Sequence, residues 1–138
     1  MKKTLTALAL ALLILSRAAY AQTDPRDQSL VVVFAAQATT ATSAPYAVIL
    51  SAAGETVWFS FSGTGIAGEY TIEGSIDTEA NVKAGTAVWT TLLTSAVLPA
   101  GPWISDPMPY LRVTIARSAG TFKVLMRGSV GTNFRKVE

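Results

Sequence analysis

The feature that most constrains the fold of this chain is the alternation of apolar and polar residues at every second position. In the run from Glu69 to Asp77 (EYTIEGSID), Tyr70, Ile72 and Ile76 fall on one face and the intervening polar side chains on the other. A period of two is typical of a β-strand with one buried face. Gly74 interrupts the apolar face and predicts a bulge or a close backbone approach.

Similar short runs follow one another along the chain, separated by Gly, Pro, Asp and Asn. Four prolines between residues 97 and 109 argue against a central strand there, because proline lacks an amide donor, but leave room for an edge strand. The predicted strands are Leu30–Ala36, Tyr46–Ala52, Glu55–Phe61, Glu69–Asp77, Ala87–Leu93, Trp103–Ser105, Tyr110–Arg117 and Thr121–Arg127. We therefore predict an all-β fold, an antiparallel and jelly-roll-like β-sandwich, over residues 46–130.

The strand parity also predicts the core of the sandwich. The residues that share the inward face are Phe59, Phe61, Ile72, Ile76, Leu111, Val113, Ile115, Phe122, Val124 and Met126. We expect a turn at 62–65 and a tight connection at 118–120 that closes the last two strands into a hairpin. No run after residue 21 shows helical periodicity.

The N-terminus has the pattern of a secretory signal peptide. Lys2 and Lys3 precede an apolar, helix-forming run from Leu5 to Leu15, and Ala19-Tyr20-Ala21 forms a small-residue cleavage signal. Two interpretations remain open: residues 1–21 are a cleaved leader, or they are a retained apolar arm. A cleaved product starts at Gln22.

The segments that flank the predicted sandwich are polar or rich in small residues. Residues 22–45 are interpreted as a linker or arm that contains one short strand, with an Ala/Thr/Ser-rich connection from 37 to 45. Residues 131–138 are interpreted as a polar tail.

The charge of the chain does not indicate a nucleic-acid partner. Of 11 basic residues, Lys2, Lys3 and Arg17 lie in the leader, which leaves eight basic and nine acidic residues in the body. The basic residues are scattered apart from Arg135 and Lys136, whereas a nucleic-acid surface needs a clustered basic patch. A membrane partner is expected through residues 1–21 alone, if they are retained.

The chain contains no cysteine and no histidine. These absences exclude disulfides, thiolate metal sites, histidine-ligated zinc and histidine-dependent triads. We therefore predict no catalytic residue, no cofactor-binding residue and no metal ligand. A small hydrolase is the weakest of the function classes considered.

Two motifs fail the requirements of the sites they suggest. Residues 63–68 match G-x-G-x-x-G in letters, but a predicted strand follows instead of a helix, which favours a turn. Asp77, Glu79 and Asn81 are spaced like calcium ligands, but Val82 occupies the sixth position, where the EF-hand needs glycine. A solvated loop is therefore the preferred interpretation, with a loose calcium site as its alternative.

The carboxylates Glu55, Glu69, Glu73 and Asp77 are the candidates for a glycosidase pair. Glu73 and Asp77 share one strand face but lie about 13 Å apart at 3.3 Å per residue, which is too far for either geometry. They are interpreted as polar residues on a wet face.

The tryptophans Trp58, Trp89 and Trp103 have two interpretations. Aromatic residues on an open sheet can bind a sugar, or they can lie in a core or a subunit contact. Trp58 is opposite in parity to Phe59 and Phe61, so one of the two faces carries an aromatic group that the core does not hold. Core or subunit contact is favoured.

Four segments between Phe61 and Gly128 carry a resemblance to a known group of proteins. They are Tyr70–Asp77 (YTIEGSID), Val88–Leu92 (VWTTL), Pro109–Ile115 (PYLRVTI) and Gly120–Gly128 (GTFKVLMRG). This half of the chain resembles small β-sandwich proteins of tailed bacteriophage virions: head-fibre, decoration and related accessory proteins. The resemblance implies a non-enzymatic structural role, as an oligomer on a capsid or tail surface.

Two functions are therefore carried forward. The first is a virion structural protein whose partners are further copies of itself and other virion proteins such as capsid or tail subunits. The second is an exported bacterial module, periplasmic or secreted after cleavage at Ala21, that binds a carbohydrate or another surface ligand. The N-terminus departs from the virion group, because a phage protein assembled in the cytoplasm needs no export leader.

Apolar runs outside the alternating strands predict an exposed interface. They are Leu30–Phe34, Val97–Leu98 and Pro102–Ile104. Because contiguous exposed apolar residues usually mark an interaction site, these runs predict an oligomer or a complex on a larger particle.

Overall fold

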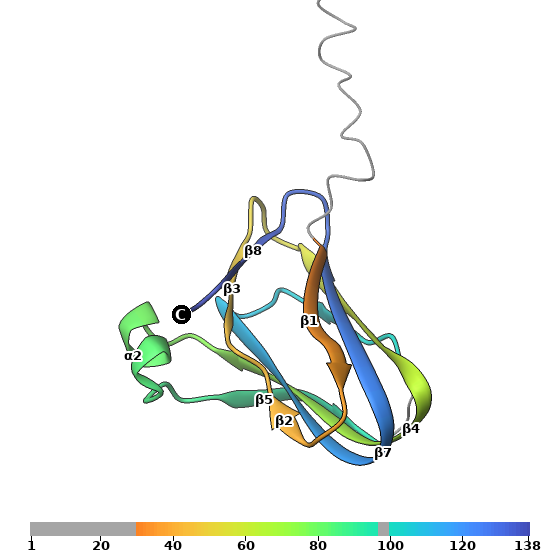
Figure 1. Ribbon diagram of the computed structural model, residues 1–138. Helices are drawn as coiled ribbons and strands as arrows, with labels where there is room; N and C mark the ends of the chain where they lie inside the picture. Colours follow the sequence, from red (N-terminus) through yellow and green to blue (C-terminus); the bar gives the residue numbers. More distant parts are fainter. Residues whose placement is uncertain (1–29, 97–99) are drawn as a thin grey trace, which may run out of the picture.

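The computed structural model describes residues 30–96 and 100–138 and shows a mostly antiparallel β protein. The predicted all-β class is thus confirmed. The predicted leader 1–21 and the pair Val97–Leu98 lie outside the described residues. The elements are β1 (Leu30–Gln37), β2 (Ala41–Thr42), β3 (Tyr46–Ile49), β4 (Thr56–Ser75), α2 (Glu79–Ala84), β5 (Thr90–Ser95), β6 (Trp103–Ser105), β7 (Tyr110–Gly128) and β8 (Asn133–Lys136) (Figure 1).

Two unusually long strands, β4 and β7, form the centre of the sheet. They pair antiparallel along almost their whole lengths, from Val57 opposite Gly128 to Ser75 opposite Tyr110. The shorter strands are added on either side: β5 and β6 pair with β4, and β1, β2 and β3 pair with β7. β8 completes the sheet beside β3.

The long pair bends back on itself. A straight strand of 20 residues spans about 66 Å, yet the rings of Phe61 and Tyr70, nine residues apart in β4, stack with centroids 4.0 Å apart. The register shifts between Thr64 and Gly68 mark the bend in β4, and β7 bends beside it (Figure 1). The sheet therefore folds into two facing halves.

We name the halves by their outer strands. The β1 half contains β1, β6 and residues 56–63 of β4 with 121–128 of β7. The β5 half contains β2, β3, β5 and β8 with residues 68–75 of β4 and 110–117 of β7.

The core lies between the two halves and agrees with the predicted parity. The residues predicted inside and found buried are Phe59, Phe61, Ile72, Leu111, Val113, Ile115, Phe122, Val124 and Met126. The tenth, Ile76, was predicted wrongly, because it is 80% exposed. β4 ends at Ser75, so the chain leaves the sheet before Ile76 reaches the next inward position.

The predicted turn at 62–65 and the predicted hairpin closure at 118–120 are both bends within continuous strands. Residues 110–117 and 121–127 do not pair with each other; each pairs with its own part of β4. The bends are packed closely: a Cβ on Gly63, whose φ is 155°, would collide with the carbonyl oxygen of Thr121. The glycines correctly predicted that the chain changes direction at these points. The predicted hairpin between 110–117 and 121–127 was wrong, because both segments pair with β4.

The flanking segments belong to the sheet more fully than the sequence indicates. The predicted strand 30–36 forms β1, and the expected loop from 37 to 45 contains β2, which pairs with Ile115 and Thr114 of β7. The expected polar tail 131–138 contains β8, and Val137 is buried. Both additions complete the β7–β3 side of the β5 half.

The short helix α2 was not predicted. Thr78 accepts a hydrogen bond from the Asn81 amide as the N-cap, and Gly85 ends the helix in the left-handed conformation. These cap residues were the available signal, but six residues are too few for apolar periodicity to show. In the described part of the chain, no helix has the length and apolar character needed to cross a membrane.

Candidate functional site

The glycine motif at 63–68 is part of the bend in β4 and has strand on both sides. A phosphate-binding loop needs a helix N-terminus directly after the glycines. The structure therefore places a strand bend where the letters suggested a nucleotide loop, in agreement with the preferred interpretation.

The candidate calcium loop is occupied by the protein's own donors. Asp77 Oδ1 accepts from the Thr78 amide at 2.9 Å and from the Asn81 side-chain amide at 2.6 Å, and its Oδ2 accepts from the Val88 amide at 3.2 Å. These hydrogen bonds, the one from Asn81 above all, lower the pKa of Asp77. Glu79 turns to Arg135 and Lys83 instead. Across residues 30–96 and 100–138, no cluster of three acidic ligands is formed.

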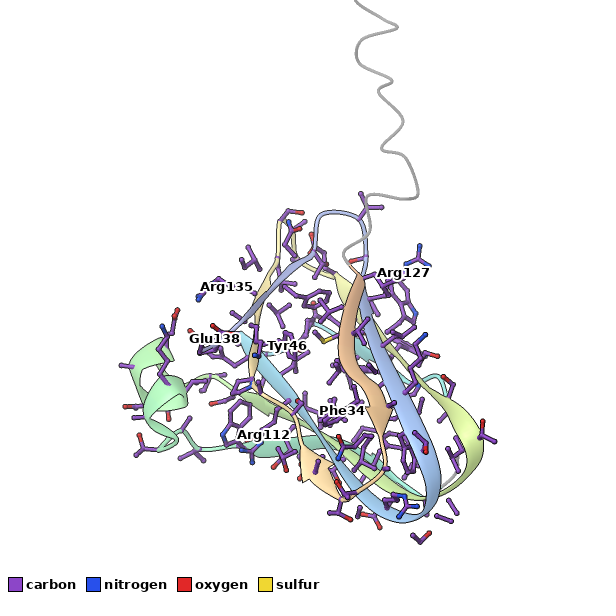
Figure 2. The ribbon with its side chains drawn as sticks, viewed as in Figure 1. Phe34, Tyr46, Arg112, Arg127, Arg135 and Glu138 are labelled. Carbon is purple, nitrogen blue, oxygen red and sulfur yellow. The ribbon has the colours of Figure 1, made fainter. Side chains whose placement is uncertain are left out.

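The remaining candidate carboxylates also have structural partners. Glu73 holds Arg112 through two hydrogen bonds of 2.7 and 3.1 Å, and the guanidinium of Arg112 lies 4.3 Å from the ring centroid of Trp89. Glu69 accepts from the Thr94 hydroxyl at 2.9 Å. These contacts lie across neighbouring strands and stabilise the β5 half; Figure 2 shows Arg112 there, far from Arg127.

Glu55 is a buried carboxylate that joins two turns. Its Oε1 accepts from the Ser51 hydroxyl at 2.5 Å, the Ser51 amide at 3.0 Å and the Ala52 amide at 2.9 Å. Its Oε2 accepts from the Thr132 hydroxyl at 2.6 Å. The Ser51 and Thr132 hydroxyls lower the pKa of Glu55 despite its burial, because they stabilise the ionised form.

This lowered pKa predicts an acid-sensitive contribution to stability. The contribution is fully present above the pKa of an unfolded glutamate, about 4.3, and is lost as the pH falls through the lower folded pKa. We expect Glu55→Gln to be less stable than wild type at neutral pH and to show a smaller loss of stability below pH about 5. Urea unfolding across this pH range measures both effects.

The control is Glu138→Gln, which changes the net charge equally at a side chain that is 78% exposed and forms an ion pair with the exposed Lys136. It should keep the wild-type dependence on pH. If the free energy of unfolding changed with pH equally in wild type and in Glu55→Gln, this would contradict the role assigned to Glu55.

The three tryptophans have different environments. Trp89 packs against the small cluster of Ala47, Val82 and Val137 and is covered by Arg112. Trp58 and Trp103 are 41% and 61% exposed. Phe59 and Phe61 face the core, so Trp58 points outward as the parity argument requires.

The exposed tryptophans form a row across the outer surface of the β1 half. In register, Trp103 of β6 is opposite Trp58 of β4, Trp58 is opposite Arg127 of β7, and Arg127 is opposite Leu30 of β1. The row thus crosses four strands, about 14 Å at the usual strand spacing. Two residues further along, Ser60, Leu125 and Val32 form a second row.

We call this surface the tryptophan face; it comprises Leu30, Val32, Trp58, Ser60, Trp103, Leu125 and Arg127. Leu30 and Val32 are 60% and 51% exposed. A depression of about 320 Å³ lies within it, lined by Leu30, Trp58, Phe59, Ser60, Leu125 and Arg127. Figure 2 shows Arg127 at the end of β7 beside the start of β1, directed away from the core.

The tryptophan face joins two of the predicted apolar runs, Leu30–Phe34 and Pro102–Ile104, which lie about 70 residues apart in sequence. Sequence reasoning identified both runs but not their connection through Trp58. A second depression of about 380 Å³ lies beside the loop before α2, lined by Ile76, Asp77, Val88, Thr90 and Met108. Its one acidic group, Asp77, is engaged as described above.

The tryptophan face has the character of a binding surface. Large aromatic side chains and arginine are enriched where proteins bind partners, and a contiguous exposed apolar patch usually marks such a site. Comparison with protein-family models, with curated proteins and with solved structures finds no match for this chain.

Proposed function

We propose that this protein is a non-enzymatic structural component of a bacteriophage virion, in a capsid-decoration, head-fibre or tail-accessory position. In this proposal its two facing sheet halves form a jelly-roll-like β-sandwich, and the tryptophan face binds another virion protein. The resemblance of residues 61–128 to virion accessory proteins supports the proposal that the particle is a bacteriophage virion.

The observation that carries the binding role is the row of Trp103, Trp58, Arg127 and Leu30 on the outside of the sheet. The inward residues of β4 and β7 in this half are buried in the core, so the fold does not need the outward side chains of the row for its own packing. Burying such aromatic anchors in a partner contributes about 2 kcal/mol or more each. The face is therefore suited to a stable contact.

The candidate carboxylates support a non-catalytic role. Glu55, Glu73 and Asp77 each hold neighbouring donors of the fold, which is the arrangement of structural groups rather than of a paired acid and base. The absence of histidine from the sequence removes the most common general base.

A carbohydrate-binding function is the second candidate, because Trp58 and Trp103 are paired residues of neighbouring strands on the outward face of the β1 half. An aromatic platform with a nearby hydroxyl and guanidinium, here Ser60 and Arg127, is also a surface on which a sugar ring can stack. In this second candidate function, residues 1–21 are a cleaved leader and the protein is exported after cleavage at Ala21.

We expect the double variant Trp58→Ala/Trp103→Ala to lower incorporation into particles by at least tenfold, because it removes both aromatic anchors. The protein is supplied in trans during infection, and copies per particle are counted by quantitative mass spectrometry of gradient-purified particles. The control is Val88→Ala, which truncates an apolar residue that is even more exposed, at 75%, and lies outside the tryptophan face. It should assemble like wild type.

Absence of the wild-type protein from the particles, with the native product starting at Gln22, would reject the virion role. If the wild type then binds sugars in a glycan array and the double variant does not, the carbohydrate function replaces it. N-terminal sequencing of the native product is therefore made on the same samples.

A further inference from the structure

The outer edge of β1 is an open strand edge. β1 pairs with β7 on one side, from Leu30 opposite Arg127 to Gln37 opposite Phe122. Among the strands that the structure describes, none pairs with its other side. A strand in this position presents a row of backbone donors and acceptors to which another strand can add.

The sequence of β1 lacks two of the devices that usually protect such an edge, charge and proline, although its ladder with β7 shifts register between Val32 and Phe34 and between Phe34 and Gln37. Natural edge strands are protected by lysine or an inward-pointing charge, by proline, by β-bulges, by being very short, or by a covering helix or loop. β1 has eight residues, LVVVFAAQ, with neither a charge nor a proline. The other edge of the β1 half, β6, has three residues and is bounded by proline-rich chain. The two edges of the same half therefore differ in their capacity to pair.

Burial also indicates that the sheet is incomplete at β1. The inward residues Val31, Val33 and Phe34 pack against the core but are only partly buried. Their neighbours across the ladder, Met126 and Val124 of β7, are fully buried. The core is thus covered up to β7 and opens at β1, where one further strand would cover it.

We infer that the open edge of β1 pairs antiparallel with β1 of a second copy of this chain. This inference rests on the proposed function and deepens it, because it assigns the surface of self-association. It uses the backbone edge of β1, whereas Leu30 and Val32 of the same strand contribute their outward side chains to the tryptophan face. An uncharged apolar strand is complementary to itself, since an antiparallel two-fold pairing brings no like charges together. Residues 22–29 (QTDPRDQS), which precede β1, are polar and contain proline.

The pairing has a geometric consequence for the tryptophan face. An antiparallel pair within one sheet is related by a two-fold axis perpendicular to the sheet, so equivalent faces of both copies lie on the same side. The strand order becomes β6-β4-β7-β1 followed by β1-β7-β4-β6. Two tryptophan faces then form one bivalent surface, which increases the avidity for a repetitive partner such as a particle surface.

Single cysteines provide the direct test, because the chain has no cysteine of its own. A residue on the two-fold axis faces its own copy with Cα atoms about 4.5–5.5 Å apart, within the span of a disulfide. The variants Val32→Cys, Ala35→Cys and Ala36→Cys are exposed positions along β1, and Ala84→Cys is an exposed control on α2. Under mild oxidation we expect rapid dimer formation at one β1 position or two neighbouring ones, and none at Ala84.

Charge at the same edge should dissociate the pair. We expect Ala35→Lys/Ala36→Lys to weaken dimerisation at least tenfold, since lysines of the two copies are brought together, while Ala84→Lys leaves it unchanged. Light scattering coupled to gel filtration measures the mass of the full chain, and circular dichroism verifies that each variant is folded.

Several results would overturn the inference: a wild-type monomer at high micromolar concentration, equal cross-linking at Ala84 and along β1, or a dimer that survives both lysines. A dimer that is lost when the chain starts at Gln22 would assign the contact to residues 1–21 and also overturn it. Trp58→Ala/Trp103→Ala should remain dimeric, so failure of particle binding and failure of the β1 contact can be distinguished.

Discussion

Val113→Asp is expected to unfold the protein or to lower its free energy of unfolding by at least about 3 kcal/mol. Val113 is 1% exposed and lies opposite Ile72 in the part of the β4–β7 pair that belongs to the β5 half. An aspartate there has no cationic partner in the surrounding apolar cluster, so the fold must bury an unpaired charge or protonate it. Urea denaturation followed by circular dichroism measures the loss.

The matched control is Thr121→Asp in the same strand. Thr121 is exposed, so its substitution introduces the same charge into β7 without desolvating it. We expect a change within about 0.5 kcal/mol of wild type. Similar melting of Val113→Asp and wild type would contradict the strand assignment on which the core rests.

Gly63→Ala is expected to destabilise the fold by about 2–4 kcal/mol, although it adds a single methyl group. The added Cβ would collide with the carbonyl oxygen of Thr121, which belongs to the backbone of β7 and cannot rotate away. The positive φ of Gly63 adds strain for any L side chain. The bend that stacks Phe61 on Tyr70 would therefore have to open.

Gly65→Ala separates the steric effect from the backbone effect. Gly65 lies in the same bend with φ of 58°, but a Cβ there meets no atom within 4 Å. Gly65→Ala should lower the free energy of unfolding by about 1 kcal/mol, because only the left-handed backbone conformation disfavours the alanine. Equal losses for Gly63→Ala and Gly65→Ala in thermal and urea unfolding would contradict close contact between the two bent strands.

These two predictions also bear on function, because the bend determines which surface is free. The sheet buries one face of each half by folding over, and the outward face of the β1 half keeps Trp58 and Trp103 in solvent. A variant that opens the bend should lose both the core and the order of the tryptophan face. Stability measurements must therefore accompany every test of particle or sugar binding.

The sequence by itself determined which side of each strand is inward. Alternation is a local property, since successive side chains of a strand point to opposite faces wherever the strand pairs. It therefore placed Phe59 and Phe61 inside and Trp58 on the opposite face of the same strand, and left open whether Trp58 lies in a core, a subunit contact or a sugar site. It failed at Ile76, where the alternation continues for one position after the strand has ended.

The tertiary structure alone decided which strands are neighbours. The runs 110–117 and 121–127 have the pattern of a hairpin, yet both pair with β4, because glycines at 63 and 120 permit a bend as readily as a turn. That choice depends on hydrogen bonds and packing between residues 35 to 71 positions apart, from Ser75 opposite Tyr110 to Val57 opposite Gly128, which no local pattern records. The same long-range pairing brings Trp103, Trp58, Arg127 and Leu30 into one row, so the candidate site could be seen only after the strands were placed side by side.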